Sequence, residues 1–514
     1  MRITYLGHAG FCVETDEMIL IMDPWLSAEG AFDSAWFQFP RNHHLARFVQ
    51  TKLEDRTRER FIYISHIHGD HFDKPFLSRA ATAQATFVIP QFRQPAFQDA
   101  ISMFPSRNVV VCHDEEDFIV PGGSLTMLVD DHEFNRDSAL LLRIDGHSML
   151  NLNDCKIHDR AANIEGVDVF TCQFSGATWH PTCYDYPPER YEQIAHQKMT
   201  QKFEAVTRTI EALQPSFFLP AAGPPCFLDP TLAHINFEPV NIFPRATEFL
   251  EFFAERHGSS KVKCVALDPG DSLDAAAGMV KRVGSGERRV EFREAVRSYA
   301  ADYADFFAEF TARHVGAQAD DIYERLAAEL QRKLDNFPLR HRVEIPLYLS
   351  GRETDSPLAR VDFARGVVGL TNDISETAYY SVAVPEWELQ RVLDGAITWE
   401  ELSLTFRVVL HRTPDVYQPH IHAFLVLQAE DLTPYCDRFQ EEEARQERIV
   451  VTAGGRSYEV DRYCRHQGGD LSLGTIVDGR HLVCPRHGWR YDLQDGGRCT
   501  TADATISAVP SRSP

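Results

Sequence analysis

The stretch SHIHGDHFD, residues 65–73, follows the apolar run RFIYI and brings three histidines and two aspartates together. A short apolar run of this kind predicts a buried strand. The loop that leaves such a strand can point His66 and His68 toward one metal ion while Asp70 and His71 turn toward a second. Imidazole and carboxylate are ligands that zinc, iron and manganese all accept. We therefore expect these four residues to bind metal; a histidine-rich surface loop is the alternative.

Residues 1–240, which contain this motif, alternate short apolar runs with turn residues. Runs such as MILIMDP, TFVIP and NVVVC predict strands, and the whole of RITYLGHAGFCVET has a strand pattern. The segment YPPERYEQIAHQKMTQKFEAVTRTIEALQP has the 3.6 period of an amphipathic helix and ends at Pro215. Strands with a helix packed outside them predict an αββα sandwich.

The rest of the chain divides into two further regions. After residue 240 the sequence becomes helical and charged, as in ADDIYERLAAELQRKLDNF, and strands return between 341 and about 430. We predict a helical and α+β central region over 241–440, in which PHIHAF is expected as a strand with His420 and His422 on one face. The polar run DRFQEEEARQER predicts a solvated helical linker. A separate all-β domain is expected over 445–514.

Length, charge and cysteine usage limit the function classes. The 514 residues are enough for three domains at about 150 residues each. A net charge of −23 argues against a nucleic-acid partner, because phosphate binding needs a basic surface. The 11 cysteines lack the spacing of a disulfide framework, which favours a reducing compartment. No signal core and no apolar stretch of membrane-spanning length is present, so we expect a cytoplasmic protein with no membrane partner.

The HxHxDH pattern of residues 66–71 resembles that of the metallo-β-lactamase superfamily. The resemblance implies that Asp23, in LIMDPWL, lies behind the metal site and fixes a histidine tautomer. It also implies that His132, in VDDHEF, is the third histidine and that Asp154, in LNLNDCK, is the bridging aspartate. The expected metal ligands are therefore His66, His68, Asp70, His71, His132 and Asp154, among which Asp70, His71 and Asp154 are the expected catalytic residues.

One ligand of this pattern is missing from the sequence. The superfamily normally closes its second metal position with a histidine after the last strand, but here the corresponding stretch reads LPAAGPPCF. His158, four residues after Asp154, and His234, in LAHINFEP, are further candidate metal ligands, and Glu238 is another. Whether the site holds one metal ion or two stays open.

Two cysteine and histidine pairs stand near the C-terminus. Cys464 and His466 lie in CRHQGGDLSLG, and Cys484 and His487 lie in CPRHGWRYDL. A Rieske [2Fe–2S] cluster needs two thiolates on one iron and two imidazoles on the other. The pairs resemble those of a Rieske domain of the oxygenase and ferredoxin branch, because the extra cysteines of respiratory Rieske proteins are absent. We expect all four residues to bind the cluster; a zinc ribbon is the alternative.

A cluster that carries one electron needs an acceptor. Only 27 residues follow His487, too few for a catalytic domain, so the N-terminal metal site is the expected recipient. Zinc has no redox chemistry, which favours non-haem iron, one or two ions, able to use the electron to activate O2.

The chain also resembles the CMP-N-acetylneuraminate hydroxylases, through HIHGDHFD, AHINFEPVN and WEELSLTFRVVLHRTPDVYQP, although that family carries its Rieske domain first. The resemblance implies a monooxygenase that hydroxylates or N-oxygenates a polar small molecule such as a sugar nucleotide or an amine. Its electrons would come from a ferredoxin or a reductase that uses NAD(P)H. Because electron transfer needs close packing of the two domains, within one subunit or across subunits, a homodimer is compatible with this hypothesis.

The loop QFSGATWHPTCYDYP contains the residues that we expect to line a substrate pocket, Trp179, His180 and Tyr184. An aromatic loop that caps the core explains them equally well. Two other functions remain open. One is a zinc hydrolase of the lactonase or phosphodiesterase kind with a redox-sensing Rieske domain. The other is an electron-transfer partner whose N-terminal site has lost its metal.

Overall fold

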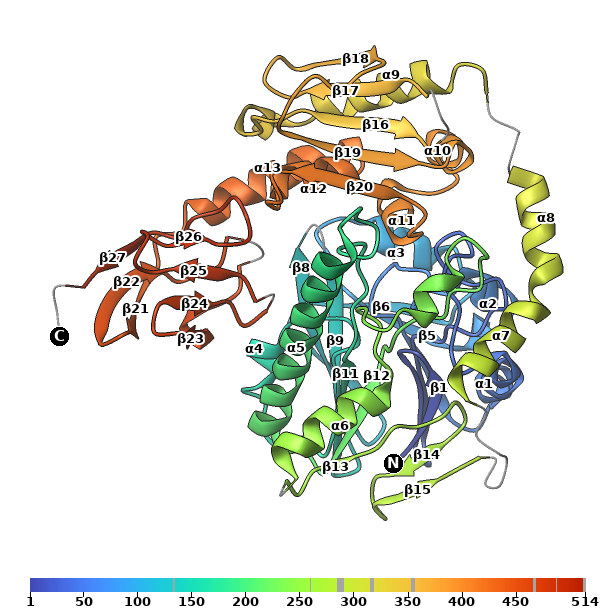
Figure 1. Ribbon diagram of the computed structural model, residues 1–514. Helices are drawn as coiled ribbons and strands as arrows, with labels where there is room; N and C mark the ends of the chain where they lie inside the picture. Colours follow the sequence, from blue (N-terminus) through green and yellow to red (C-terminus); the bar gives the residue numbers. More distant parts are fainter. Residues whose placement is uncertain are drawn as a thin grey trace. The chain divides into compact units, whose positions relative to one another are not determined.

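The computed structural model describes residues 1–132, 135–258, 260–283, 291–314, 319–352, 356–465, 468–486 and 488–511, without the side chains of His132 and Asn135. The chain forms two compact units (Figure 1). Unit 1 comprises Met1–Ala177 and Glu192–Ala304, and unit 2 comprises Thr178–Tyr191 and Asp305–Pro514. No helix in the described part of the chain is long and apolar enough to cross a membrane.

Unit 1 contains an eight-stranded sheet of order β15-β14-β1-β2-β3-β4-β5-β6. Strands β3, β4, β5 and β6 run parallel to one another, and every residue of β3 and β5 is buried, as expected for strands covered on both faces. The strands are β1 (Arg2–Gly7), β2 (Gly10–Glu14), β3 (Met18–Met22), β4 (Glu59–Tyr63), β5 (Thr86–Pro90), β6 (Asn108–Cys112), β14 (Ser272–Asp274) and β15 (Met279–Lys281).

A second, seven-stranded sheet of order β13-β12-β11-β10-β9-β8-β7 completes unit 1. Its strands β10, β11, β12 and β13 are parallel, and β7 to β10 form an antiparallel meander. The strands are β7 (Asp117–Val120), β8 (Gly123–His132), β9 (Asn135–Ile144), β10 (His147–Asn151), β11 (Val169–Gln173), β12 (Phe217–Ala221) and β13 (Lys263–Cys264).

Apolar side chains of both sheets form one core, with helices outside it. Leu20 of β3 and Leu142 of β9 belong to the same buried cluster, as does Val49 of helix α1. Helices α5 and α6 lie against the seven-stranded sheet (Figure 1). Phe203 of α5 packs on Phe249 of α6, and Phe249 contacts Phe218 of β12. The predicted αββα sandwich is therefore confirmed. The helices of unit 1 are α1 (Ala46–Glu54), α2 (Lys74–Arg79), α3 (Ala96–Ser102), α4 (His158–Ala161), α5 (Pro188–Leu213), α6 (Ala246–His257) and α7 (Phe292–Asp302), with 3-10 turns η1 (His43–Leu45), η2 (Thr82–Gln84) and η3 (Ala233–Phe237). The next helix, α8 (Ala304–His314), belongs to unit 2 from Asp305 on.

The structure differs from the sequence prediction at both ends of unit 1. The run RITYLGHAGFCVET is not one strand, because Gly7 has a φ of 103° and the chain turns at His8 and Ala9 between β1 and β2. Unit 1 also extends past residue 240. Strand β14 pairs antiparallel with β1, which joins residues 272–281 to the first sheet.

Unit 2 contains a five-stranded sheet of order β18-β17-β16-β19-β20 with helices beside it. PHIHAF is not a strand: it begins helix α12, because Pro419 fits the first turn of a helix. The run DRFQEEE is helical, as predicted. The elements are α9 (Ile322–Asp335), η4 (Pro338–Arg342), β16 (Leu347–Gly351), β17 (Leu358–Asp362), β18 (Val367–Thr371), β19 (Tyr379–Val384), α10 (Glu386–Leu393), α11 (Trp399–Leu404), β20 (Val409–Thr413), α12 (Pro419–Val426) and α13 (Ala429–Glu443).

The C-terminal part of unit 2 is all-β, as predicted. A three-stranded sheet, β21-β22-β27, and a four-stranded sheet, β23-β24-β25-β26, share one small core that includes Cys464 and Cys484. The elements are β21 (Arg448–Ala453), β22 (Arg456–Asp461), η5 (Leu471–Leu473), β23 (Thr475–Val477), β24 (His481–Val483), β25 (Arg490–Asp492), β26 (Arg498–Cys499) and β27 (Ala508–Pro510).

His420 of α12 makes the stability of unit 2 sensitive to acid. Its ring is buried, with Nδ1 3.0 Å from Tyr435 Oη. Burial, assisted by the charge of Arg342, lowers the pKa of His420 from 6.5 to about 4. As the pH falls below 6.5, His420 binds a proton in the unfolded chain but not in the folded chain, so the free energy of unfolding falls. Between pH 7.5 and 5.5 the loss is about 1 kcal/mol.

We expect His420→Gln to reduce this acid sensitivity. Thermal unfolding at pH 7.5 and 5.5 should show a smaller decrease of the unfolding temperature in the variant than in the wild type, while a substitution of the exposed His113 in unit 1 should leave the decrease unchanged. Equal decreases in all three proteins would contradict the buried neutral state of His420.

Candidate functional site

The candidate metal site of unit 1 lies where several strands end. Asp23 follows β3, residues 65–73 follow β4, Asp154 follows β10, and His8 lies in the turn between β1 and β2. Four residues at these ends have positive φ angles: His8 (50°), Asp23 (40°), Asn153 (49°) and Ala222 (45°). Non-glycine residues adopt this left-handed conformation at a cost, and such strain gathers at functional sites.

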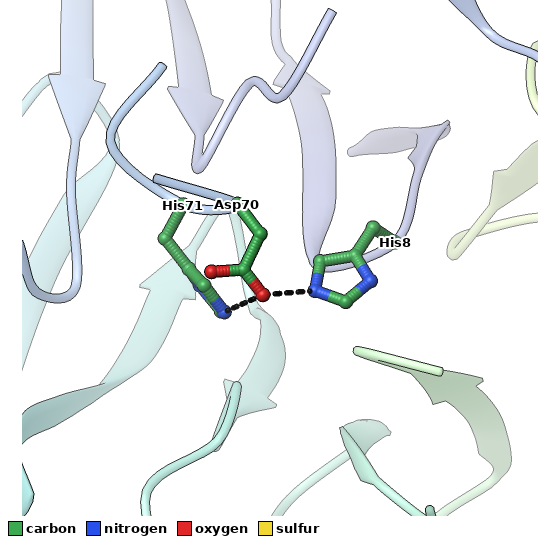
Figure 2. A group of neighbouring side chains, drawn as sticks. All are labelled: His8, Asp70 and His71. Carbon is green, nitrogen blue, oxygen red and sulfur yellow. Dashed lines mark hydrogen bonds and ion pairs between the residues drawn. The ribbon is translucent and has the colours of Figure 1, made fainter. Parts of the chain in front are cut away.

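Two groups of side chains in unit 1 could each hold a metal ion. His66, His71 and Asp154 form one, and His8, Asp70 and His71 form the other; within each group the candidate ligand atoms lie within 4.8 Å of one another. Figure 2 shows the second group, in which Asp70 Oδ2 lies between His8 Nε2, at 3.0 Å, and His71 Nε2, at 3.8 Å. The structure thus brings four of the six predicted ligands into these two groups and adds His8.

The polar atoms of these groups fit a metal cation. Asp70 Oδ1, His71 Nε2 and Asp154 Oδ1 are buried and have no hydrogen-bond partner among the described residues. Buried polar atoms without partners are costly, and a cation bound by them removes the cost. Imidazole nitrogen together with carboxylate oxygen suits iron, manganese or zinc.

Asp23 holds the site from behind, as the superfamily resemblance implies. Its Oδ2 accepts a hydrogen bond from His71 Nδ1 at 2.8 Å, which directs the Nε2 lone pair of His71 toward the ligand groups. Its two oxygens also accept the Ser65 backbone N–H at 2.8 Å and the Ser65 hydroxyl at 2.6 Å. Asp23 therefore fixes both the ring of His71 and the start of the loop after β4.

His66 and His68 lie side by side in the same loop. His66 Nε2 is 2.9 Å from His68 Nδ1, and the two rings are 4.5 Å apart. On its other side, His66 Nδ1 faces Asp137 Oδ1 of β9 at 3.2 Å. His66 is buried, whereas His68 is half-buried and contacts the ring of Phe32. His68 is thus close enough to His66 to share a metal ion with it.

The buried charges of the site stabilise one another. Burial opposes the ionisation of Asp70, but His71 and His8 outweigh it and lower the pKa of Asp70 to about 2. The pKa of Asp154 is lowered in the same way, chiefly by His71. Burial lowers the pKa of His71, but the charges of Asp70 and Asp154 overcome this and raise it well above its usual value. The two aspartates are thereby kept as carboxylates, the form that binds metal.

Other predicted ligands lie elsewhere or outside the described residues. The side chain of His132, at the end of β8, lies outside the described residues. His158 is buried and its Nδ1 is 3.0 Å from Thr209 Oγ1 of α5. His234 is exposed, with Glu238 4.0 Å away. Within the described parts of the chain, none of His158, His234 and Glu238 joins a metal-type group.

The expected pocket residues Trp179, His180 and Tyr184 belong to unit 2. His180 Nε2 is 3.2 Å from both Tyr186 Oη and Arg412 Nη2, and Tyr184 stacks on Tyr186. Trp179 is buried and meets the edge of His422 of α12. These contacts show an aromatic loop packed within unit 2. They leave its role as a substrate pocket a proposal.

His8 and Asp137 are site residues that sequence reasoning missed. His8 stands in LGHAGF, whose pattern predicts part of a single strand, and only the turn between β1 and β2 brings it to the metal groups. Asp137 lies beside His66 because β8 and β9 form a long hairpin whose register no local motif reveals. A histidine between two glycines that break a strand pattern was the available signal for His8.

The two cysteine loops of unit 2 have the same pattern of backbone hydrogen bonds. Cys464 N–H donates to Gly469 O at 2.9 Å and Gly468 N–H donates to Cys464 O at 3.0 Å. In the other loop, Cys484 N–H donates to Trp489 O at 2.9 Å and Gly488 N–H donates to Cys484 O at 3.1 Å. Gly468 and Gly488, each four residues after its cysteine, have φ angles of 60° and 69°. Both loops therefore make the same glycine-dependent turn.

Each cysteine lies in the small core, as a cluster ligand should. Cys464 and Cys484 are both buried, and a Cβ at Gly469 would stand 2.9 Å from Cys484 Sγ, so only glycine leaves this sulfur room. Tyr491 Oη lies 3.1 Å from Cys464 Sγ. Burial and the nearby sulfur raise the pKa of Tyr491, so its phenol stays protonated and can donate to a thiolate. His466 and His487 lie outside the described residues.

The fold of unit 1 and the cysteine loops of unit 2 define a protein of two different parts. Residues 2–222 match the family model of a beta-lactamase superfamily domain, and residues 422–511 match that of the Rieske [2Fe-2S] domain. The chain therefore has an N-terminal metallo-β-lactamase-like domain and a C-terminal Rieske domain.

The chain is similar to several proteins of known name. A protein of Mycobacterium tuberculosis that carries the name of a Rieske 2Fe-2S iron-sulfur protein is 28% identical over 98% of both chains. The cytidine monophosphate-N-acetylneuraminic acid hydroxylase of Danio rerio is 24% identical over 43% of this chain and 38% of its own length. Among solved structures, the diiron β-hydroxylase CmlA of Streptomyces venezuelae aligns over 55% of this chain and 54% of its own, with 14% identity and a TM-score of 0.34.

We expect Asp23→Asn to weaken metal binding by about 10- to 100-fold, because the amide cannot accept from Ser65 and His71 as the carboxylate does. Metal retained during dialysis against a graded chelator measures the effect. Asp16→Asn, at an exposed aspartate before β3, is the matched control and should behave like the wild type. Equal retention by both variants would contradict the role of Asp23.

Removal of the Tyr491 hydroxyl should lower the reduction potential of the cluster. Hydrogen bonds to ligand sulfur stabilise the added electron, so Tyr491→Phe makes reduction harder. A potentiometric titration followed by electron paramagnetic resonance measures the potential, with Tyr458→Phe, at a buried tyrosine of the same core, as the control. An unchanged potential in Tyr491→Phe would show that the phenol does not bond the cluster.

Proposed function

We propose that this protein is an iron-dependent monooxygenase in which a Rieske cluster delivers electrons to non-haem iron in the metallo-β-lactamase-like domain. The observation that carries the proposal is the presence, in one chain, of a Rieske domain and of buried nitrogen and oxygen ligand groups at the strand ends of unit 1. Bound iron would supply activation of O2 with electrons from the cluster. Zinc could not accept them.

The ligand groups themselves favour a second redox centre rather than a simple electron carrier. Among the described residues, the metal-type groups lie only in unit 1, and all of their members except Asp154 are buried. In an electron carrier whose N-terminal site had lost its metal, Asp70, His71 and Asp154 would keep buried polar atoms without hydrogen-bond partners. No bound cation would then offset their free-energy cost. In our proposal the site holds one or two iron ions, with His66, His68 and His132 at one position, Asp70 and His71 at the other, and Asp154 as the bridging ligand.

Lys202 of α5 is a residue that can hold and release a proton near this site. Its Nζ donates to Gln173 Oε1 at 3.1 Å, at the end of β11, the strand beside the one that leads to Asp154. Burial lowers the pKa of Lys202 to about 8, although the charge of Asp154 opposes the shift. A group with this pKa can donate a proton at neutral pH, which the reduction of O2 requires.

The route into the cluster loops is built from aromatic side chains of unit 2. Tyr417 contacts His422 on one side, with ring centroids 5.6 Å apart, and Trp489 of the second cysteine loop on the other, at 5.9 Å. His422 in turn meets Trp179 at 5.6 Å. The loop with Trp179 follows Ala177, where the chain leaves unit 1. These contacts support electron transfer between the cluster and the segment that connects the two units.

The substrate that we propose is a polar small molecule, hydroxylated at carbon or oxygenated at an amine nitrogen. The homology with a hydroxylase of a cytidine monophosphate sugar supports a sugar nucleotide as the first class to test. A ferredoxin or a reductase that uses NAD(P)H would provide the electrons, and Trp179, His180 and Tyr184 would contribute to substrate binding. We further propose that the protein acts in the cytoplasm, alone or as a homodimer.

Iron and acid-labile sulfide, measured together in His68→Ala and wild type, test the proposal. The wild type should contain more than two irons per chain with two sulfides, and His68→Ala should fall toward two irons while it keeps both sulfides and the spectrum of the reduced cluster. His113→Ala, at an exposed histidine after β6, is the matched control. Two irons in every protein would contradict the proposal. If unit 1 held zinc and turnover needed no electron donor, the result would instead support a zinc hydrolase of the lactonase or phosphodiesterase kind.

A further inference from the structure

The second metal position is incomplete by the pattern of its superfamily. The histidine that normally follows the last strand is replaced here by Ala221, Ala222 and Gly223. Among the described residues, neither His234 nor Glu238 lies in one of the two metal-type groups. Asp70 and His71 would then be the only side chains of the loop after β4 at this position. Together with Asp154, the bridging aspartate of the superfamily pattern, they give three protein ligands, one fewer than the four of a closed site.

We propose that His8, from the turn between β1 and β2, replaces the missing histidine and binds the second metal ion through Nε2. His8 points toward Asp70, and its candidate ligand atom lies within 4.8 Å of those of Asp70 and His71 (Figure 2). The side chains of all three residues are at most 5% exposed. The proposal rests on metal binding by unit 1, as the proposed function does, but not on the reaction or on the identity of the metal.

The backbone places His8 beside the turn where the missing histidine would stand. Ala222, directly after β12, donates its N–H to the His8 carbonyl at 2.8 Å. The same carbonyl accepts the hydroxyl of Tyr5 at 3.0 Å. An imidazole from the β1 and β2 turn therefore enters the site next to the end of β12. The chain supplies the same chemical group from a neighbouring strand end.

The ring of His8 is held in a fixed orientation. Trp25 meets it edge-on at 5.1 Å, and His71 does so at 5.4 Å. Its Nε2 is 3.0 Å from Asp70 Oδ2, while Asp70 Oδ1 has no hydrogen-bond partner among the described residues. The orientation needed for a ligand is thus present before metal binds, and one carboxylate oxygen stays available.

The conformation of His8 favours a functional explanation over a structural one. Its φ of 50° lies in the region where glycine is relaxed and most other residues are strained. The turn around it is tightly packed, since a Cβ at Gly7 would stand 2.7 Å from Asn42 Nδ2 and one at Gly10 would stand 3.1 Å from the Asp23 carbonyl. A histidine in a turn that suits glycine indicates that its side chain is needed.

Two substitutions that tolerate this conformation test the proposal. His8→Asn keeps a left-handed residue and can still donate a hydrogen bond to Asp70, but its amide is a poor ligand. His8→Gly removes the side chain and leaves a space that free imidazole can enter. Each protein is reconstituted anaerobically with ferrous ion alone, and iron and sulfide are counted per chain, with His113→Ala as the matched control.

We expect two irons beyond the cluster in the wild type and in His113→Ala, one in both His8 variants, and recovery of the second in His8→Gly when imidazole is added. Equal iron in the wild type and both His8 variants, whether one ion or two, overturns the assignment of His8 and leaves the proposed function intact. Absence of iron beyond the cluster in the wild type overturns both. Because the readout is metal content at constant sulfide, a variant that lost its fold would reveal itself by losing the cluster as well.

Discussion

Burial of charge at the strand ends of unit 1 is the constraint on which the site depends. Asp70 and His71 are almost fully removed from water, and Asp154 points a buried oxygen at His71 from 3.5 Å. Without metal the site relies on one protonated imidazole between two carboxylates, and three ligand atoms stay without hydrogen bonds. Such an arrangement is expensive, since removing an ion from water costs several kcal/mol. These residues indicate that a bound cation offsets the cost of burying the charges.

The residues behind the ligand groups show how the fold tolerates the free-energy cost of these buried charges. Asp23, at a positive φ after β3, fastens the loop after β4 through Ser65 and His71, and it does so across two parallel strands. The left-handed residues His8, Asn153 and Ala222 mark three other strand ends at the same site. The large apolar core shared by the two sheets offsets the free-energy cost of this local backbone strain.

Much of the architecture could be predicted because its signals are local. The αββα sandwich follows from short apolar runs and the period of α5, and the cysteine loops follow from spacing, including the glycines that both turns require. The errors arose where tertiary pairing decides. The pattern of LGHAGF predicts one strand, but the segment turns and brings His8 to the site. PHIHAF alternates like a strand but forms α12, and β14 joins the first sheet after a long separation in sequence. None of these outcomes is readable from the segment alone.

The central claim is that electrons from the Rieske cluster reduce a second centre in the same protein. An anaerobic reductive titration, with the electrons counted per chain and the cluster followed by its own spectrum, tests this claim most directly. The cluster accepts one electron, so the account predicts that the iron-loaded protein takes up more than one before reduction is complete. Uptake of a single electron per chain, matched to the cluster spectrum, would contradict it.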